Sequence, residues 1–343
     1  MADEGLGRAG GADLHDAQAA PASGATTLPR KPTLKTIAAL TGLAVPTVSR
    51  ALADAPDLAA HTKALVRRVA AEVGYVPNRA GVRLRTGRTN VIALVLSTET
   101  EMMNHTARLI SSLAATLQGT AFHLNVTPLS PADDPLKPVR HIVETGLADA
   151  VIFNQTEPED ARVAWLRERS FPFATHGRTR WAASHAWFDF DNEAWAAMGV
   201  RRLAALGRRR VALLAPPLRQ NYAQDIVRGA LGHGLAGVEA RLIEGASSDD
   251  GHAATREAVG RALDEGADGL VCASTAAAIG AVAAIEERGL ALGREADLFA
   301  KEAIPFLRIF RPGILAVRED VGRAGAVLGR AAMQAIRAPG LPP

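Results

Sequence analysis

The fold class predicted from the sequence is a small all-α helix-turn-helix domain followed by a larger α/β body of two lobes. Three observations predict it. Residues 31–76 form a basic segment whose apolar residues recur at helical spacing. From residue 90 onward, short apolar runs alternate with amphipathic segments, which is typical of βαβ units and parallel sheets. The length of 343 residues suits a small domain plus a large one better than a single domain.

Residues 1–30 precede the first predicted helix. They are rich in alanine, glycine and aspartate and show no apolar periodicity, so we expect a disordered tail. Their acidic residues and lack of an apolar core do not fit a signal peptide. Cys272 is the only cysteine, so no internal disulfide can form and a cytoplasmic location is expected. The apolar run at 91–96 is far too short to cross a membrane.

Charge is distributed unevenly along the chain. Residues 30–88 contain eleven lysines and arginines against three acidic residues, a net charge of +8, so the remainder sums to −5. This contrast indicates a module that binds a polyanion, attached to a body that keeps it soluble. A solvated charged surface without a partner is the alternative that charge alone leaves open.

The basic segment reads as three short helices. Thr33 is suited to cap the first helix, and Gly42 ends it. After a tight turn, 46–52 forms a second helix with a proline in its first turn, where proline is tolerated. A third helix over about 60–73 places its apolar residues on one stripe and ends at Gly74.

The first two helices have the residues that a helix-turn-helix needs. Ile37, Leu43 and Val48 are predicted to form a miniature core, and the small Ala38 allows the helices to approach closely. Polar and apolar groups able to contact phosphates and base edges then remain on or near the exposed start of the second helix. These residues are Val45, Pro46, Thr47, Ser49 and Arg50. An ordinary helical hairpin is the alternative interpretation of this segment.

The body, 90–343, is long for a single sheet and is better interpreted as two doubly wound lobes. Its predicted strands are the apolar runs 91–96, 121–126, 149–154, 171–176, 211–216, 269–274 and 314–320. Amphipathic stretches such as 193–206 and 275–288 are predicted helices between them. The basic run Arg208–Arg210 is interpreted as part of a lobe and not as a nucleic-acid surface.

Longer sequence strings make a family resemblance specific. T-x-x-x-I-A-x-x-x-G-x-x-x-x-T-V-S-R-A-L at 33–52, GYVPNRA at 74–80 and RTGRT at 85–89 resemble the LacI/GalR family of bacterial regulators. The resemblance implies a DNA-binding domain at 31–76, a hinge helix or linker at 77–89, and a ligand-binding and dimerisation domain at 90–343. The hinge is expected to fold on operator DNA and to insert Leu84 into the minor groove.

The DNA-binding residues expected from the motif and the resemblance combine the helix-turn-helix with the hinge. They are Thr33, Lys35, Val45, Pro46, Thr47, Ser49, Arg50, Asn78, Arg79, Arg83, Leu84 and Arg85. The Val45-Pro46 pair replaces the tyrosine-glutamine pair of the lac repressor branch, so we expect apolar contacts to thymine methyls and a different operator. Gly81 stands where the family usually has alanine, which predicts a hinge helix more dependent on DNA.

For the body, the resemblance implies a periplasmic-binding-protein-like (type I) effector domain with a ligand between strand ends. FDFDNE at 188–193 matches the family's crossover into the second lobe, where Asn192 is a candidate helix cap. Several positions depart from the family's usual sugar contacts, so no purine or ordinary galactoside pocket is carried over. The expected ligand-binding residues are His176, Arg178, Phe188, Asp191, Tyr222, Gln224, Asp225, Ser274, Thr275, Lys301 and Glu302.

Two strings suggest a branch of the family. FDFDNE together with AKEAIPFLRIFRP at 300–312 resembles the α-glucoside operon repressors of proteobacteria. The function implied is a homodimeric repressor of a sugar operon that binds double-stranded operator DNA and is released by a small-molecule sugar inducer. Lys301 leaves an acidic or phosphorylated sugar open. The sign of regulation, and dimer versus tetramer, also stay open.

Catalysis is not expected. The sequence contains no HExxH, P-loop, GxSxG or paired-cysteine motif, and its nine histidines are scattered. Cys272 lies in an apolar run, where cysteine is more often a core residue than a nucleophile. We therefore expect no catalytic residue, no cofactor, no metal site and no membrane partner. The competing interpretations are a periplasmic-type sugar receptor without DNA regulation and an α/β enzyme with a helical N-terminal extension.

Overall fold

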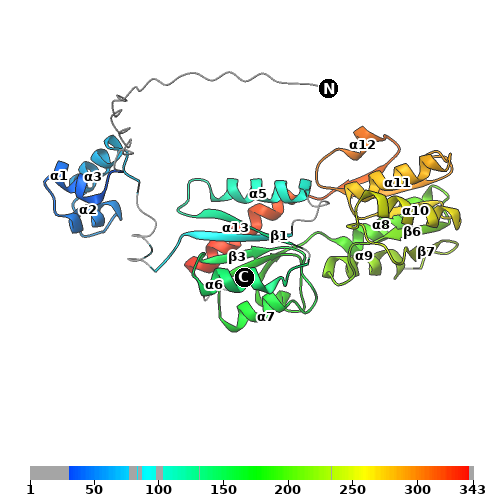
Figure 1. Ribbon diagram of the computed structural model, residues 1–343, viewed down its shortest axis with the longest axis horizontal. Coiled ribbons are helices and arrows are strands. Elements are labelled where there is room, and N and C mark those ends of the chain that lie inside the picture. The colour runs from blue at the N-terminus through cyan, green and yellow to red at the C-terminus, as the bar shows by residue number, and fades with distance from the viewer. Residues whose placement is uncertain are drawn as a thin grey trace, which may run out of the picture. The chain divides into compact units, whose positions relative to one another are not determined.

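The computed structural model of this protein describes residues 31–76, 83, 87–97, 103–130, 132–232 and 234–339. The chain divides into two compact units, Met1–Asn78 and Arg79–Pro343. Figure 1 shows helices alone in the described part of the first unit, and sheets covered by helices in the second. No helix in these described ranges is both long and apolar enough to cross a membrane.

The first unit contains three helices: α1 (Leu34–Thr41), α2 (Val45–Leu52) and α3 (Ala60–Glu72). Thr33 caps α1 in a reciprocal pair of bonds with Thr36, and Gly42 ends the helix in the left-handed region at φ 68°. The cap at Thr33 and the end at Gly42 confirm the prediction for α1. α2 begins one residue before the predicted 46–52, and α3 ends one residue before the predicted 73. The fully or nearly buried core consists of Ile37, Val48, Ala51, Val66, Val69 and Ala70, with Leu43 packed against it.

The first lobe of the second unit is a five-stranded parallel sheet in the order β2-β1-β3-β4-β5. Its strands are β1 (Val91–Ser97), β2 (His123–Leu129), β3 (Ala150–Phe153), β4 (Phe173–His176) and β5 (Ala186–Phe188). Helices α5 (Met103–Leu117) and α13 (Val321–Arg337) pack against one face of this sheet. Helices α6 (Leu136–Glu144) and α7 (Ala161–Glu168) pack against the other. The central strands are buried on both sides, which is why their sequences read as continuous apolar runs.

The second lobe repeats this design with the strand order β10-β9-β8-β6-β7, again all parallel. Its strands are β6 (Arg210–Leu214), β7 (Glu239–Leu242), β8 (Gly269–Cys272), β9 (Asp297–Glu302) and β10 (Leu315–Arg318). One face carries α8 (Asn192–Ala205) and α9 (Asn221–Leu231). The other carries α10 (His252–Asp264) and α11 (Thr275–Glu287), with the short α12 (Leu307–Phe310) beside α11. The two sheets confirm the predicted pair of doubly wound lobes.

The chain enters the second lobe between β5 and α8 and returns to the first between β10 and α13. At the first crossover Asp191 is the residue that caps α8, accepting from the backbone N–H of Ala194. The expectation that Asn192 is the cap is therefore wrong, because Asn192 already has helical position and its amide instead donates to the carbonyl of Phe190. Arg208 pairs with Asp297 inside the second lobe, as expected for a structural arginine.

Three strands were not predicted from the sequence: β5, β7 and β9. β5 has only three residues, and β7 is a largely half-buried edge strand with charged residues. β9 reads DLFAKE, and its charges interrupt the apolar pattern although five of the six residues are buried. β2 also starts two residues later than the predicted run at 121–126.

Candidate functional site

The predicted DNA-reading helix has one buried side and one accessible side. Val48 and Ala51 of α2 are fully buried in the core of the first unit. The predicted reading residues lie outside that core, exposed or half-buried: Val45, Pro46, Thr47, Ser49 and Arg50. A short helix of this kind, held by a neighbouring helix and presenting its first turns, has the shape that enters a major groove.

Ion pairs within the first unit neutralise part of its positive charge. Arg50 pairs with Asp57. Asp54 pairs with both Lys63 and Arg67, and their hydrogen bonds and charges lower the pKa of the Asp54 carboxyl group. The Arg50 side chain is nevertheless 51% exposed, and a surface pair of this kind contributes about 1 kcal/mol at most. Arg50 can therefore exchange Asp57 for a phosphate at small cost.

The other predicted DNA-binding residues divide into three groups. Thr33 uses its hydroxyl to cap α1, and Lys35 is exposed without an ion pair among the described residues. Arg83 donates to the backbone carbonyl of Thr145 in the second unit, with an N–O distance of 3.1 Å. The remaining four lie outside the described residues: Asn78, Arg79, Leu84 and Arg85.

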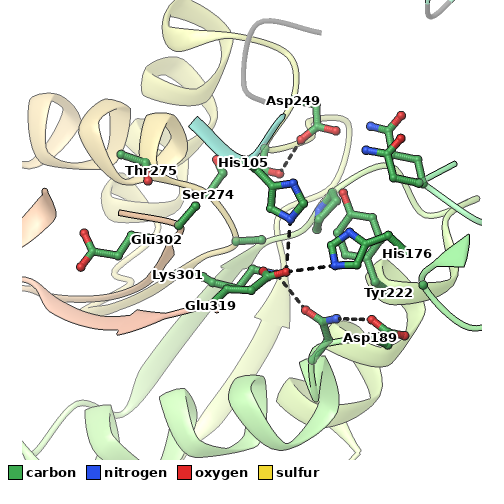
Figure 2. Close-up of a pocket in the computed structure, with 18 residues that line it drawn as sticks. His105, His176, Asp189, Tyr222, Asp249, Ser274, Thr275, Lys301, Glu302 and Glu319 are labelled. Atoms are coloured by element: carbon green, nitrogen blue, oxygen red, sulfur yellow. Dashed lines mark hydrogen bonds and ion pairs between the residues drawn. The ribbon is translucent and has the colours of Figure 1, made fainter. Parts of the chain in front are cut away.

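A cavity of about 110 Å³ lies in the second unit, where strands of both lobes end and helices of both lobes begin. We call it the strand-end cavity; Figure 2 shows its lining side chains. Its position agrees with the expectation that open α/β sheets bind ligands beyond the carboxyl ends of their strands. Six of the predicted ligand-binding residues line it: His176, Tyr222, Ser274, Thr275, Lys301 and Glu302.

Four charged or titratable side chains meet in this cavity. Oε1 of Glu319 lies 3.2 Å from Nε2 of His105 and 3.7 Å from Nε2 of His176, while its Oε2 lies 3.1 Å from Nζ of Lys301. Burial and the nearby charges of His105 and Lys301 lower the pKa of His176 to about 3. Burial alone would raise the pKa of Glu319, but Lys301 and His105 outweigh it and hold this pKa well below its usual range. At neutral pH, His176 is neutral and Glu319 is ionised.

The ammonium group of Lys301 already has several partners within the protein. Besides Glu319, its ammonium donates to Oδ1 of Asn192 at 2.9 Å. It also lies 5.2 to 5.7 Å from the ring centroids of Phe190, Trp195 and Tyr222, within range of cation–π attraction. A lysine with this set of partners is a weak attractor for an anionic ligand.

Two lining residues also have structural hydrogen bonds. Ser274 caps α11 by accepting from the N–H of Ala277, and Oε2 of Glu302 accepts from the N–H groups of Phe306 and Leu307. By contrast, the buried Nδ2 of Asn154 has no hydrogen-bond partner among the described residues. Nδ2 of Asn154 is therefore a donor available to a bound molecule.

Five predicted ligand-binding residues do not line the cavity. Arg178 bridges two carboxylates, Asp189 and Asp225, at 3.2 and 3.1 Å. Asp191 caps α8, and the exposed Gln224 donates to the carbonyl of Leu218. Phe188 packs against the core of the first lobe and stacks on His176 at 6.2 Å. Each of these side chains is instead held by packing, an ion pair or a hydrogen bond elsewhere: Arg178, Phe188, Asp191, Gln224 and Asp225.

Eight lining residues with polar side chains were missed in the sequence. They are His105, Asn154, Gln155, Asp189, Asn192, Ser248, Asp249 and Glu319. Asn154 and Glu319 directly follow β3 and β10, so the strand-end rule applied to every run would have found them. His105 lies in the first turn of α5, and no local signal distinguishes it from the other histidines.

Comparison with known proteins gives relatives for both units. Residues 33–78 match the family described as bacterial regulatory proteins, lacI family, and residues 200–343 match a periplasmic binding protein-like domain. The chain is 31% identical to the HTH-type transcriptional regulator AglR of Rhizobium meliloti (strain 1021), over 87% of this chain and 86% of that protein. That relative is a transcriptional regulator.

Two solved structures share the fold. The lac repressor dimer bound to operator and the anti-inducer ONPF has a TM-score of 0.77 at 20% identity, covering 91% of this chain and 94% of that chain. The complex of the transcriptional regulator CelR with cellobiose has a TM-score of 0.65 at 21% identity, covering 91% and 95%. These likenesses confirm the predicted architecture of a helix-turn-helix domain and a periplasmic-binding-protein-like pair of lobes.

Proposed function

Because this chain belongs to the lacI family of bacterial regulatory proteins, we propose that it is a repressor whose hold on operator DNA is weakened by a neutral sugar. The sugar binds in the strand-end cavity. Two copies of the chain bind a palindromic operator, with α2 of each copy in a major groove. Arg50 and Lys35 contact phosphates there, and Val45 and Pro46 contact thymine methyl groups.

The observation that carries the sugar assignment is the chemistry of the cavity lining. Asn154 offers an unused donor, Ser274 and Thr275 offer hydroxyl groups, and Tyr222 offers an aromatic ring. Hydroxyl-rich molecules are bound by such convergent polar groups around an aromatic face. Residues of both lobes line the cavity, so one ligand can contact both lobes.

The charges of the lining favour a neutral ligand over an acidic or phosphorylated one. Four carboxylate side chains line the cavity against the single ammonium group of Lys301: Asp189, Asp249, Glu302 and Glu319. Lys301 is itself neutralised by Glu319. An anion entering the cavity would approach these carboxylates, and the Lys301 ammonium that could attract it is already paired.

Ligand binding in this cavity is coupled to DNA through the lobes. A sugar that contacts both lobes shifts the equilibrium between the arrangements that the two lobes can adopt. Through the predicted hinge at 77–89, this shift changes the distance between the α2 helices of the two copies. Linkage requires that operator DNA change the affinity for the sugar by the same factor. The resemblance of FDFDNE and AKEAIPFLRIFRP to α-glucoside operon repressors makes α-glucosides the first class to test.

The test uses the full chain and an operator selected from random DNA. Operator affinity is measured by fluorescence anisotropy with maltose, sucrose, cellobiose and glucose 6-phosphate in turn. We expect one neutral disaccharide to weaken operator binding about tenfold or more, a coupling of about 1.4 kcal/mol, and the phosphosugar to have no effect. If no DNA sequence is selected, the proposal that this chain is a DNA-binding regulator is refuted. If glucose 6-phosphate alone weakens operator binding, the assignment of a neutral sugar is refuted.

Matched variants locate the response. Asn154→Ala removes the unused donor of the cavity, and we expect it to reduce the sugar response while leaving operator affinity unchanged. Gln224→Ala, an exposed residue of the same unit that does not line the cavity, is the control and keeps both properties. An equal loss of the sugar response in both variants would show that the strand-end cavity is not the sugar site.

A further inference from the structure

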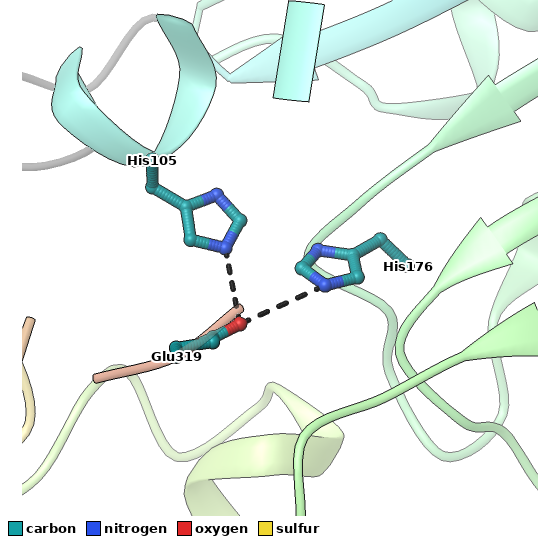
Figure 3. Close-up of side chains that lie close together, drawn as sticks. All are labelled: His105, His176 and Glu319. Atoms are coloured by element: carbon teal, nitrogen blue, oxygen red, sulfur yellow. Dashed lines mark hydrogen bonds and ion pairs between the residues drawn. The ribbon is translucent and has the colours of Figure 1, made fainter. Parts of the chain in front are cut away.

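We propose that His105, His176 and Glu319 form a binding site for a divalent transition metal of the zinc class. The site lies within the strand-end cavity, and Figure 3 shows the two imidazole rings directed at one carboxylate. The site is not predictable from the sequence, because its three residues are scattered along the chain and show no metal-ligand spacing. The proposal is independent of the proposed sugar, since metal binding is measured directly.

The three ligand atoms lie close to the spacing that a bound zinc ion requires. Oε1 of Glu319 lies 3.2 Å from Nε2 of His105 and 3.7 Å from Nε2 of His176, and all three atoms lie within 4.8 Å of one another. Tetrahedral zinc with bonds of about 2.0–2.2 Å holds its ligand atoms about 3.3 Å apart. Small side-chain rotations are therefore sufficient to bring all three atoms onto one ion.

The side chains come from three separate elements that hold their positions. His105 lies in the first turn of α5, His176 ends β4, and Glu319 follows β10. The two rings lie 5.0 Å apart between centroids, and the ring of His176 is also stacked on Phe188. Ligands fixed by a helix, a strand end and a crossover lose little side-chain entropy when an ion binds.

Nε2 of His176 has no other evident role in the protein. The His176 side chain is only 9% exposed, and its Nε2 makes no hydrogen bond to any described residue. A buried polar atom without a partner is costly and in native structures points to a missing water, ion or ligand.

Lys301 is compatible with this site because it holds the other oxygen of the carboxylate. Its ammonium lies 3.1 Å from Oε2 of Glu319, which leaves Oε1 for the ion. Carboxylate ligands of metals are commonly oriented by such outer partners. The repulsion between Lys301 and the ion is opposed by Asp189 and Asp249, which also line the cavity.

The ligand set selects the class of metal. Two imidazoles and one carboxylate suit zinc, cobalt or nickel, whereas magnesium and calcium prefer oxygen ligands alone. Three protein ligands leave a fourth position open, as in zinc sites that exchange water for another ligand. In this protein that position faces the cavity, where a water or a hydroxyl group of a bound molecule completes the coordination.

The experiment titrates Zn²⁺ into the full chain after treatment with a chelator, by calorimetry and by competition with a chromophoric chelator. We expect one zinc ion per chain, and a Co²⁺ complex with the intense absorption of tetrahedral coordination. His176→Ala and Glu319→Gln are expected to lower zinc affinity by about 100-fold or more. His141→Ala, which removes an exposed histidine of α6, is the control and keeps the wild-type affinity.

Folding is checked independently by circular dichroism, and His105→Gln provides a second, milder ligand substitution. Absence of zinc binding, or equal zinc affinity in the His176→Ala and His141→Ala chains, overturns the metal site. Operator binding by the chelator-treated protein is measured beside it. If zinc does not bind but the chain still binds operator DNA, the metal site is refuted and the proposed repressor function is not. If zinc binds but the chain selects no operator, the repressor function is refuted and the metal site is not.

Discussion

The reading helix of the first unit and the strand-end cavity of the second expose their polar groups in opposite ways. The polar side chains of α2 are accessible and come from one stretch of eight residues. Those of the cavity are largely buried and come from distant segments: His105 and Glu319 are 214 residues apart in the sequence. A surface built on one short helix depends on the packing beneath it, whereas a cavity built from many segments depends on the whole second unit.

The ion pairs of the two regions also differ in how exposed they are to water. Arg50 is 51% exposed and pairs with an equally exposed Asp57, so water screens the pair and either partner can be replaced. Glu319 is 7% exposed and is held by Lys301 and His105, and removing one partner leaves a buried charge uncompensated. Substitutions should therefore have small, additive effects on the reading surface and large, coupled effects in the cavity.

The largest expected effect is the loss of one unit without the other. Ile37 is fully buried in the small core of the first unit, and Ile37→Asp places an unpaired carboxylate there at a cost of more than about 4 kcal/mol. We expect the first unit to unfold and operator binding to vanish, while calorimetry shows an unchanged transition for the second unit. Ile37→Val is the conservative control. Retained operator binding in Ile37→Asp would contradict the assignment of this core.

The converse experiment targets the second unit. A Cβ at Gly229 of α9 would lie 2.1 Å from the backbone carbonyl oxygen of Glu193 in α8, and backbone cannot move aside cheaply. Gly229→Ala is expected to destabilise the second unit by about 3 kcal/mol and to leave the transition of the first unit in place. Gly234→Ala, with open space around the added methyl group, should be neutral. Equal melting temperatures for the two variants would show that α8 and α9 are not packed this closely.

Acidification tests the buried cluster of the cavity. The folded-state pKa of His176, about 3, lies below its usual value near 6.5, so the unfolded state binds the proton more readily. Stability is therefore complete above about pH 6.5 and falls as the pH decreases, by about 2 kcal/mol at pH 5.0. Urea unfolding at pH 7.5 and 5.0 measures this loss, and His176→Gln should remove most of it. A His176→Gln chain with the same pH dependence as wild type would assign the effect to other groups, such as His185.

The smallest expected effect belongs to the exposed pair of the reading surface. Arg50→Ala should lower DNA affinity a few-fold and reduce the slope of log affinity against log salt by about one, as for the loss of a single phosphate contact. Asp57→Asn frees Arg50 from its intramolecular partner and should raise affinity slightly. Anisotropy over a salt series measures both. A large loss confined to one operator sequence would instead show that Arg50 reads a base.

The sequence predicted the three helices at 34–72 to within one residue because their caps and turns are local. The cap at Thr33, the left-handed Gly42 and the packing of Ile37 on Val48 lie within sixteen residues of one another. The buried central strands of both sheets were equally readable, since a strand covered on both faces is a continuous apolar run. Strands with exposed or charged residues, such as β7 and β9, lack that pattern.

For the cavity, the sequence determined which polar side chains stand at the ends of predicted strands. His176 and Ser274 end two of the predicted runs, and both line the cavity. The tertiary structure alone decided which of the candidates face the cavity. Arg178 does not line the cavity because it pairs with Asp189 and Asp225, whereas His105 of the remote helix α5 does line it. The physical reason is that helix caps and core stripes are set by neighbours along the chain, whereas the partner of a buried charge is set by whichever segment folding brings beside it.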